Sequence, residues 1–472
     1  MVGVRTSRLG SLVLALATAA SAGCATFSRD GGFIETQQAV KQATGADAAW
    51  QLDERSSSEA LARVDALLAS PLTADAAVQV ALLSNPGLQA TYAELRITEA
   101  DRVQAGRLPN PMLALLRTWS GDEFKIERVL GIDVMALLTM KSRGAIEARR
   151  FEAAKVKAAA STVGVAFQAR RAFLDVVGAE QAALYAAQVV ESAEAGRDLA
   201  RELAGTGNWS RLALDREQVF YAESMLQLAR TREQAHARRE ALIRTLGLWG
   251  PRTAITLPER LPDLPDAVDE MQDLEQRAMA QRLDIRLATL ELDATAHALG
   301  LTKATRLVNV LEAGPAQTRE GGGRMLNGYE VSLDVPIFDW GGARVKRAQA
   351  IYTQQMMRVR ATAITARSQV REAYIAYRTA YDIARHYRDE IVPLRKRISD
   401  EQLLRYNGML ISVFELLADS RDQVTSVNGY IDALRLFWVA SANLQQAMVG
   451  SIDETAAQGP TPGGMPARAA VH

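Results

Sequence analysis

The stretch GYEVSLDVPIFDWGG, residues 328–342, differs from most of this chain because its apolar residues alternate with polar ones. The apolar positions are Tyr329, Val331, Leu333 and Val335, followed by Ile337. Alternation with a period of two is typical of a β-strand, whereas much of the remaining sequence has the longer spacing of helices. The segment therefore predicts a strand with one apolar and one charged face inside a mainly helical protein.

The composition gives no support for several classes of function. The 472 residues include 55 basic and 55 acidic side chains, so the basic surplus that favours nucleic-acid binding is missing. Four scattered histidines and one cysteine have no ligand spacing, and we expect neither a metal site nor a cofactor. No nucleotide-binding loop or nucleophile–base set is found, so the sequence does not predict an enzyme.

The N-terminus has the pattern of an export signal. Arg5 and Arg8 precede the apolar run at residues 9–20, and SAGC follows at residues 21–24. The pattern resembles a bacterial lipoprotein signal, which predicts cleavage of residues 1–23 and acylation, for example by palmitate, of Cys24. An ordinary signal peptide with a chance cysteine is the alternative. Because Ala25 rather than Asp follows the cysteine, we expect the outer membrane rather than the inner one.

The chain contains an internal duplication. GIDVMALL at residues 131–138 is similar to SLDVPIFD at 332–339, and the same spacing separates Gly207 from Gly408 as separates Asp133 from Asp334. We expect a linker over residues 24–70, a first repeat over 71–250 and a second repeat over 251–452. The tail over residues 453–472 is rich in proline, glycine and alanine and is predicted to be disordered.

Each repeat reads as helix, two strands, long helix, turn and helix. In the first repeat these elements are a helix from 73 to 106 interrupted at Asn85-Pro86, strands at 112–120 and 123–135, and helices at about 140–204 and up to 247. In the second repeat they are a helix at 268–304, strands near 306–318 and 328–338, a helix at 342–405 and a helix at 413–450. Thr73 is the expected N-cap of the first helix, and Pro393 should bend the last long helix.

The long helices carry a heptad seam of mostly small residues. In the second repeat the seam is Val359, Ala363, Ala366, Val370, Ala373, Tyr377, Ala380, Ala384, Tyr387 and Ile391. The equivalent positions of the first repeat run from Ala158 to Val190. Taken alone, this pattern also fits a plain coiled coil.

The strands decide between these interpretations. After residue 24 no run approaches the roughly 20 apolar residues of a membrane helix, so a membrane would have to be crossed by strands. Because the helices bury their seams against each other, the apolar strand faces are free to meet lipid. Four strands cannot close a barrel, and open edges are not tolerated in hydrocarbon, so several chains would have to combine.

With these features the chain resembles the TolC family of outer-membrane efflux channels. The segments that carry the resemblance are LTADAAVQVALLSNPGLQATYAEL, AGRLPNP, VSLDVPIFDWGGARVKRAQA and RYNGMLISVFELLADSRDQV, within residues 70–450. The resemblance implies a mainly α fold with a transmembrane β part: a homotrimer with a twelve-stranded β-barrel in lipid and a long periplasmic α-barrel. It also implies a passive duct coupled to a periplasmic adaptor and an inner-membrane transporter. The segment before the first repeat would lie along the outside of the helices.

The resemblance also implies the roles of two helical tips, which in the family close the entrance and dock the adaptor. By position these tips correspond to Gly207, Asn208, Ser210, Arg211 and Leu212, and to Tyr406, Gly408, Ser412, Val413 and Leu416. Glu415 and Asp419, four residues apart, would line a pore constriction. The alternative is that both carboxylates face solvent. The second tip has one more residue than the first between its glycine and its serine, which leaves the register of the two tips open.

Two other functions compete with the duct. A periplasmic coiled-coil scaffold or adaptor lipoprotein would explain the helices and Cys24 without a membrane barrel. A hydrolase of the cell envelope would use Asp133, Asp334 or Glu330 as acids, but the duplicated aspartates on strand faces fit a lumen lining better than a cleft. The residues do not choose between drugs, metal ions, solvents and proteins as cargo.

Overall fold

The computed structural model describes residues 26–268, 272–308 and 310–452. The predictions for the signal peptide, Cys24 and the tail over 453–472 lie outside these residues. The chain divides into two compact units, and each combines segments of both predicted repeats. Unit 1 consists of Met1–Thr36, Ala90–Ala158 and Asp284–Ala363, and unit 2 consists of Gln37–Gln89, Ala159–Leu283 and Ile364–His472.

The described residues are mainly helical with one four-stranded sheet. In chain order, the elements are α2 (Phe33–Thr44), α3 (Glu54–Leu68), α4 (Ala74–Ser84), α5 (Pro86–Ala105), β1 (Met112–Ser120), β2 (Glu123–Asp133), α6 (Val134–Gly205), α7 (Arg211–Leu246), η1 (Gly250–Thr253), α8 (Leu274–Gln281), α9 (Leu283–Ala304), β3 (Leu311–Glu320), β4 (Leu326–Leu333), α10 (Gly342–His386), η2 (Tyr387–Ile391), α11 (Val392–Asn407) and α12 (Val413–Val449). Among the described helices, none has both the length and the hydropathy needed to cross a membrane.

The first helices begin where side chains satisfy free backbone groups. Oγ1 of Thr73 accepts a hydrogen bond of 3.1 Å from the N–H of Ala76, which confirms the predicted N-cap of α4. α4 ends at Ser84 and α5 begins at Pro86, at the predicted interruption. Proline has no N–H and a fixed φ, so it is compatible with the first turn of a helix but not with its interior.

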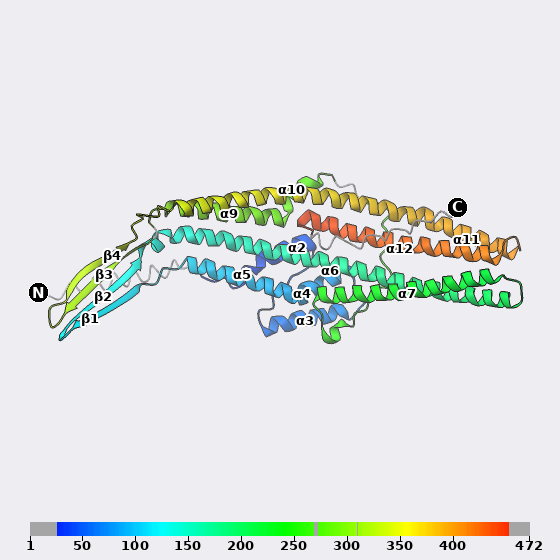
Figure 1. Ribbon diagram of the computed structural model, residues 1–472, viewed down its shortest axis with the longest axis horizontal. Helices are drawn as coiled ribbons and strands as arrows, with labels where there is room; N and C mark the ends of the chain where they lie inside the picture. The colour runs from blue at the N-terminus through cyan, green and yellow to red at the C-terminus, as the bar shows by residue number, and fades with distance from the viewer. Residues whose placement is uncertain (1–25, 269–271, 309, 453–472) are drawn as a thin grey trace. The chain divides into compact units, whose positions relative to one another are not determined.

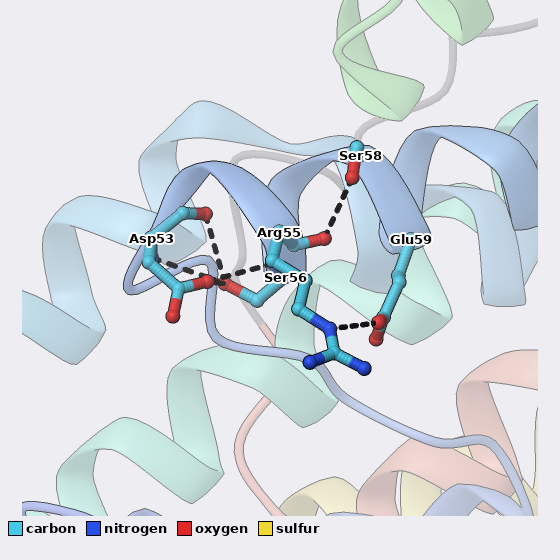
Figure 2. Close-up of polar contacts among 5 residues, drawn as sticks. All are labelled: Asp53, Arg55, Ser56, Ser58 and Glu59. Atoms are coloured by element: carbon cyan, nitrogen blue, oxygen red, sulfur yellow. Dashed lines mark hydrogen bonds and ion pairs between the residues drawn. The ribbon is translucent and has the colours of Figure 1, made fainter.

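A capping box begins α3 (Figure 2). The N–H of Ser56 donates to Oδ1 of Asp53 at 2.7 Å, and the N–H of Asp53 donates to the hydroxyl of Ser56 at 3.1 Å. The Ser56 N–H lowers the pKa of the Asp53 carboxyl because it hydrogen-bonds to the charged form. Nε of Arg55 lies 3.0 Å from Oε1 of Glu59 one turn later. These exposed contacts stabilise the start of the helix.

The predicted heptad seam is the buried side of the long helices. Along α10, Ala366 and Val370 are buried while the arginines beside them, Arg367 and Arg371, are exposed. The buried seam residues of α6 are Ala158, Thr162, Ala169, Val176 and Ala186. The spacing of small residues therefore identified the packed face of both helices.

The second long helix is interrupted near Pro393. α10 ends at His386, residues Tyr387–Ile391 form a π-helical turn, and α11 begins at Val392. Pro393 cannot donate a hydrogen bond to the carbonyl four residues earlier, and its ring would collide with that carbonyl in a regular α-helix. A wider π turn accommodates the proline without ending the helix. The structure thus shows a local change in helix type before Pro393, while the predicted bend stays a prediction.

In unit 1 the strands form one antiparallel sheet in the order β1-β2-β3-β4 (Figure 1). The strand predicted over residues 112–120 is confirmed as β1, and the strand predicted over 123–135 ends slightly earlier, at Asp133. The strand predicted over 328–338 ends at Leu333, so the prediction is wrong for the residues after it. Leu333 pairs with the first residue of β3, Leu311, and Pro336, three residues later, has no N–H with which a ladder could continue.

The N-terminal segment of unit 1 packs against α5 and α6. The N–H and Oγ of Ser28 each lie 2.6 Å from Oε1 of Glu99, a carboxylate of α5 that is almost fully buried. Nζ of Lys155, a buried lysine of α6, lies 2.6 Å from Oε2 of Glu35 in α2. These contacts fix Ser28 and Glu35 onto α5 and α6 within this unit.

Unit 2 has an aromatic core around Phe437 of α12. Its ring stacks on Tyr377 at a centroid distance of 5.5 Å and forms a T-shaped pair with Trp438 at a centroid distance of 5.1 Å. The hydroxyl of Tyr381 donates a hydrogen bond of 2.6 Å to the carbonyl of Asp266, in the segment before α8. The aromatic side chains thereby hold the connection between the two repeats against the helices of unit 2.

Candidate functional site

The strand pairings divide the sheet into two chemically different faces, because directly paired residues of antiparallel strands lie on the same face. The apolar face consists of Leu113, Leu115, Arg117, Trp119, Phe124, Ile126, Arg128, Leu130, Ile132, Leu311, Ala313, Pro315, Gln317, Arg319, Asn327, Tyr329, Val331 and Leu333. The acidic face has the charged residues Glu123, Lys125, Glu127, Asp133, Glu312, Glu320 and Glu330, and its other members are mainly small or hydroxyl-bearing.

Predicted lipid-facing residues lie on the apolar face, and their side chains are uncovered. Tyr329 is 85% exposed and Val331 is 56% exposed. Leu333 ends β4, and Val335 lies beyond the strand but is also exposed. Every residue of β1 and β4 is exposed, so within the described chain no layer of side chains covers these strands. A single sheet with an uncovered apolar face needs another apolar environment.

The acidic face is also open, with few internal pairs. Nζ of Lys125 lies 2.6 Å from Oε1 of Glu127 and 3.8 Å from Oε1 of Glu320. Asp133, one of the acids considered for hydrolysis, accepts a hydrogen bond of 2.7 Å from the N–H of Ala136 and so caps the start of α6. Within the described residues, no group of three or more His, Cys, Asp or Glu side chains is arranged to hold a metal ion.

The two outer strands of the sheet are unpaired along one side. β1 pairs only with β2, and β4 pairs only with β3, in the part of the chain that the structure describes. The free edges are Met112–Ser120 and Leu326–Leu333. Such edges expose backbone N–H and C=O groups that are available to pair with strands of another chain.

The first helical tip joins α6 to α7 in unit 2. Gly207 has a φ of 78°, and the N–H of Asn208 donates to the carbonyl of Leu203 at 2.9 Å, as in a glycine-terminated helix. Oγ of Ser210 then caps α7 by accepting a hydrogen bond of 3.2 Å from the N–H of Ala213. The two other predicted tip residues, Arg211 and Leu212, follow at the start of α7 and are exposed.

The second tip has the same geometry with a different register. Gly408 has a φ of −79°, and the left-handed residue is Met409, with a φ of 58°. The N–H of Leu410 donates to the carbonyl of Arg405 at 2.9 Å, as Asn208 does in the first tip. Structurally, Met409 rather than Gly408 is thus the counterpart of Gly207. The extra residue noted in the sequence lies before this position.

Tip residues that sequence reasoning missed are Met409 and Leu410. Their side chains are 94% and 78% exposed, which makes them the most accessible large apolar groups of this tip. Of the predicted residues, Tyr406 is partly exposed, Ser412 is the N-cap of α12, Val413 is its first residue, and Leu416 is half-buried. The apolar pair after Gly408 is visible in the sequence, but its exposure and the positive φ of Met409 are not visible from residue types.

The two carboxylates predicted to line a constriction have different surroundings. Oε2 of Glu415 accepts a hydrogen bond of 3.3 Å from the N–H of Ser412, and Glu415 is exposed. This contact is half of a capping box, so Glu415 also stabilises the start of α12. Asp419 is only 9% exposed, and its Oδ2 has no hydrogen-bond partner among the described residues. Although they are four residues apart, these carboxylates are not equivalent.

The two tip hairpins are joined in unit 2 by an ion pair between a partly exposed arginine and a buried glutamate. Nη2 of Arg421 in α12 lies 2.6 Å from Oε1 of Glu217 in α7. Close to this pair, a Cβ added at Gly196 of α6 would lie 3.4 Å from Cδ2 of Leu417 in α12, which is an ordinary van der Waals contact. The sequence did not identify the contact between Arg421 and Glu217.

Comparisons with known proteins support one class of fold. No family model matches the chain. The cobalt-zinc-cadmium resistance protein CzcC of Cupriavidus metallidurans is 24% identical over 277 residues, which are 57% of this chain and 64%, less than two thirds, of that protein. Among solved structures, CusC, described for transmembrane channel formation, has a TM-score of 0.69 at 16% identity and covers 80% of this chain and 92% of its own.

Two further structures agree with this result. The CmeC outer membrane channel of Campylobacter jejuni has a TM-score of 0.68 at 15% identity, over 79% of this chain and 85% of that one. The MtrE outer membrane channel of Neisseria gonorrhoeae, in its open state, has a TM-score of 0.65 at 16% identity, over 79% of this chain and 88% of that one. The resemblance stated from the sequence is therefore confirmed at the level of the fold.

Proposed function

We propose that this chain, which has the fold of outer-membrane channels, is the outer-membrane component of a tripartite efflux or secretion system. Three copies would form a passive exit duct, coupled to a periplasmic adaptor and an inner-membrane transporter. The free energy for transport would come from the transporter, because the duct itself only provides a path. The solved channels share the fold, and the curated relative is a metal-resistance protein.

The observation that carries the proposal is the exposed two-faced sheet with two free edges. In a closed assembly, β4 of one copy would pair with β1 of the next, which would satisfy the backbone groups of both edges. The apolar face would meet lipid, and the acidic face would line the lumen. Three copies of four strands give the twelve-stranded barrel that the sequence resemblance implies.

The N-terminus supports a membrane anchor. Acylation of Cys24 would place lipid only a few residues before Ser28, whose contacts with Glu99 fix the chain to α5. Because α5 leads into β1, the anchor would lie on the membrane side of unit 1. The acyl chains would strengthen the anchoring that the sheet provides in the outer membrane.

The two tips are the proposed adaptor-docking and entrance surface. Met409 and Leu410 join the residues named from the sequence, because exposed apolar side chains at a tip offer area to a helical partner. Glu415 and Asp419 remain the proposed constriction. Of the cargo classes, we favour cations, since six of the seven charged residues on the acidic face are carboxylates.

Reconstitution tests the proposal. The purified protein should run as a detergent-stable trimer and form pores in a planar bilayer, with a reversal potential that indicates cation selectivity. The competing scaffold or adaptor function predicts a water-soluble protein once the acyl chains are removed, and no conductance. A soluble, non-conducting protein without detergent would contradict the channel.

A further inference from the structure

The apolar face carries its charged side chains in one small area. These are Arg117 of β1, Arg128 of β2 and Arg319 of β3, and no acidic residue shares the face with them. All three are exposed. Within the described residues, none of the three guanidinium groups has a carboxylate partner, although Arg117 lies 5.8 Å from the centroid of the Phe124 ring.

The strand registers place the three arginines side by side. Arg117 and Arg319 are both paired with Ile126 and therefore lie in one row, two strand spacings or about 9–10 Å apart. Arg128 lies in the next row of the middle strand, diagonal to both at about 7–8 Å. Long arginine side chains can converge on one group across such distances. We call these residues the arginine triad.

Arg117 and Arg319 lie in the second row of the apolar face from the β1–β2 turn, and Arg128 lies one row further from the turn, at the middle of β2. The row between these residues and the β1–β2 turn holds the aromatic pair Trp119 and Phe124. The rows toward the helices contain only Leu113, Leu130, Pro315, Tyr329, Ile132, Ala313, Val331, Leu311 and Leu333. Arginine on a lipid-facing strand is costly at the bilayer midplane but not at the interface, so the row of Arg117 and Arg319 marks the interfacial level, and the long side chain of Arg128 can extend toward that level.

The charged groups of the opposite face are arranged differently, because they form ion pairs. Lys125, which is on β2 near the β1–β2 turn, pairs with Glu127 and Glu320 of the acidic face. The triad instead presents several donors in an area without acids. Guanidinium groups recognise phosphate by paired, charge-assisted hydrogen bonds.

We infer that the arginine triad binds the phosphate groups of a lipid in the outer leaflet of the membrane. This inference rests on the proposed function, which places the apolar face in lipid and the hairpin turns at the cell exterior. The ligand is a lipid with a phosphorylated headgroup. Its acyl chains would lie along the apolar rows between the triad and the helices. The contacts would fix the depth and orientation of each copy in the bilayer.

The test measures lipid binding by the purified full-length protein in detergent. The probes are bisphosphorylated lipid A, the same lipid after enzymatic removal of its phosphates, and inorganic phosphate. The dephosphorylated lipid should bind the wild-type protein at least about tenfold more weakly, because charge-assisted hydrogen bonds are lost. Equal binding of the two lipids, or inorganic phosphate bound as tightly as the intact lipid, would overturn the inference.

Variants provide the second arm. The triple variant Arg117→Gln, Arg128→Gln and Arg319→Gln should bind lipid A as weakly as the wild type binds the dephosphorylated form. Lys125→Gln, a loss of positive charge on the acidic face, should bind lipid A like the wild type. Wild-type affinity in the triple variant would overturn the proposed role of the arginine triad. The proposed channel function would still stand if trimers and conductance are observed. A wild-type protein that forms no membrane trimer would overturn both this inference and the proposed function.

Discussion

Nη2 of Arg421 lies 2.6 Å from Oε1 of Glu217, and the Glu217 side chain is only 2% exposed. The guanidinium group also lies 4.4 Å from the centroid of the Phe220 ring. These two contacts of Arg421 connect α12 to α7 and join the two tip hairpins within unit 2. Because the carboxylate is buried and the arginine is partly exposed, the two partners should respond differently to mutation.

Arg421→Met should destabilise the protein more than Glu217→Gln. The first change leaves a buried carboxylate without its partner, which costs about 3–5 kcal/mol. The second removes a charged hydrogen bond but leaves a neutral amide, at a cost of about 1.5–3 kcal/mol. Denaturant unfolding in detergent measures both. Glu401→Gln, which breaks the exposed pair with Arg405, is the control and should change the unfolding free energy by about 0.5 kcal/mol or less.

Met409→Gly should stabilise the second tip. Met409 has a φ of 58°, a conformation that costs a non-glycine residue about 1 kcal/mol relative to glycine. Amide hydrogen exchange at the ends of α11 and α12 should slow accordingly.

The two tip glycines are the matched controls. Gly207→Ala, at a φ of 78°, should destabilise the first tip by about 1 kcal/mol. Gly408→Ala should have little effect, because Gly408 has a negative φ and an added Cβ would make only ordinary contacts, the nearest at 3.5 Å. A large loss for Gly408→Ala would contradict the register derived for the tips.

Asp65→Asn should reduce stability at neutral pH but not at low pH. Nε and Nη2 of Arg252 bind the two carboxylate oxygens of Asp65 at 2.6 and 2.9 Å, and this contact lowers the pKa of Asp65. A lowered folded pKa gives stability that is present above the unfolded pKa of about 3.9 and is lost as the pH falls through the folded pKa. Urea midpoints measured from pH 7 to pH 2 should therefore converge for the two proteins.

A double-mutant cycle identifies the cause. In the Arg252→Met background, Asp65→Asn should no longer produce the pH-dependent difference. If the difference persists in that background, another group lowers the pKa of Asp65.

Leu333→Asp should prevent trimer formation, whereas Leu333→Val should be tolerated. A carboxylate on the apolar face costs about 1–3 kcal/mol for each copy in the membrane, and three copies are affected at once. Ser332→Asp is the control, because Ser332 is the next residue along β4 and lies on the acidic face. Trimers in detergent are quantified on unheated gels, and unimpaired trimers of Leu333→Asp would count strongly against the barrel.

Cys24→Ser should yield a protein without a lipid anchor. Metabolic labelling with palmitate should mark the wild-type protein and leave the variant unlabelled. Because the sheet alone is proposed to anchor the protein in the membrane, the variant should still fractionate with the outer membrane. A labelled variant would show that another residue carries the acyl chain.

The sequence by itself determined approximately where the strands lie and which residues form the packed sides of helices. Alternation defined the strand that contains Tyr329 and Val331, and the four-three spacing of small residues defined the buried side of α10, because both patterns depend only on local backbone geometry. Thr73 and the Asn85-Pro86 break followed from equally local hydrogen bonding. These properties need no knowledge of what lies far away in the chain.

Tertiary structure decided what depends on register and on contacts between distant segments. Only the strand pairing brought Arg117 and Arg319 into one row, since they belong to different repeats. Only the backbone conformation showed that Met409, and not Gly408, is the counterpart of Gly207. Likewise, the burial of Glu217 against Arg421 comes from the packing of two hairpins. Periodicity gives the face of an element, but the neighbour of that face is fixed by packing.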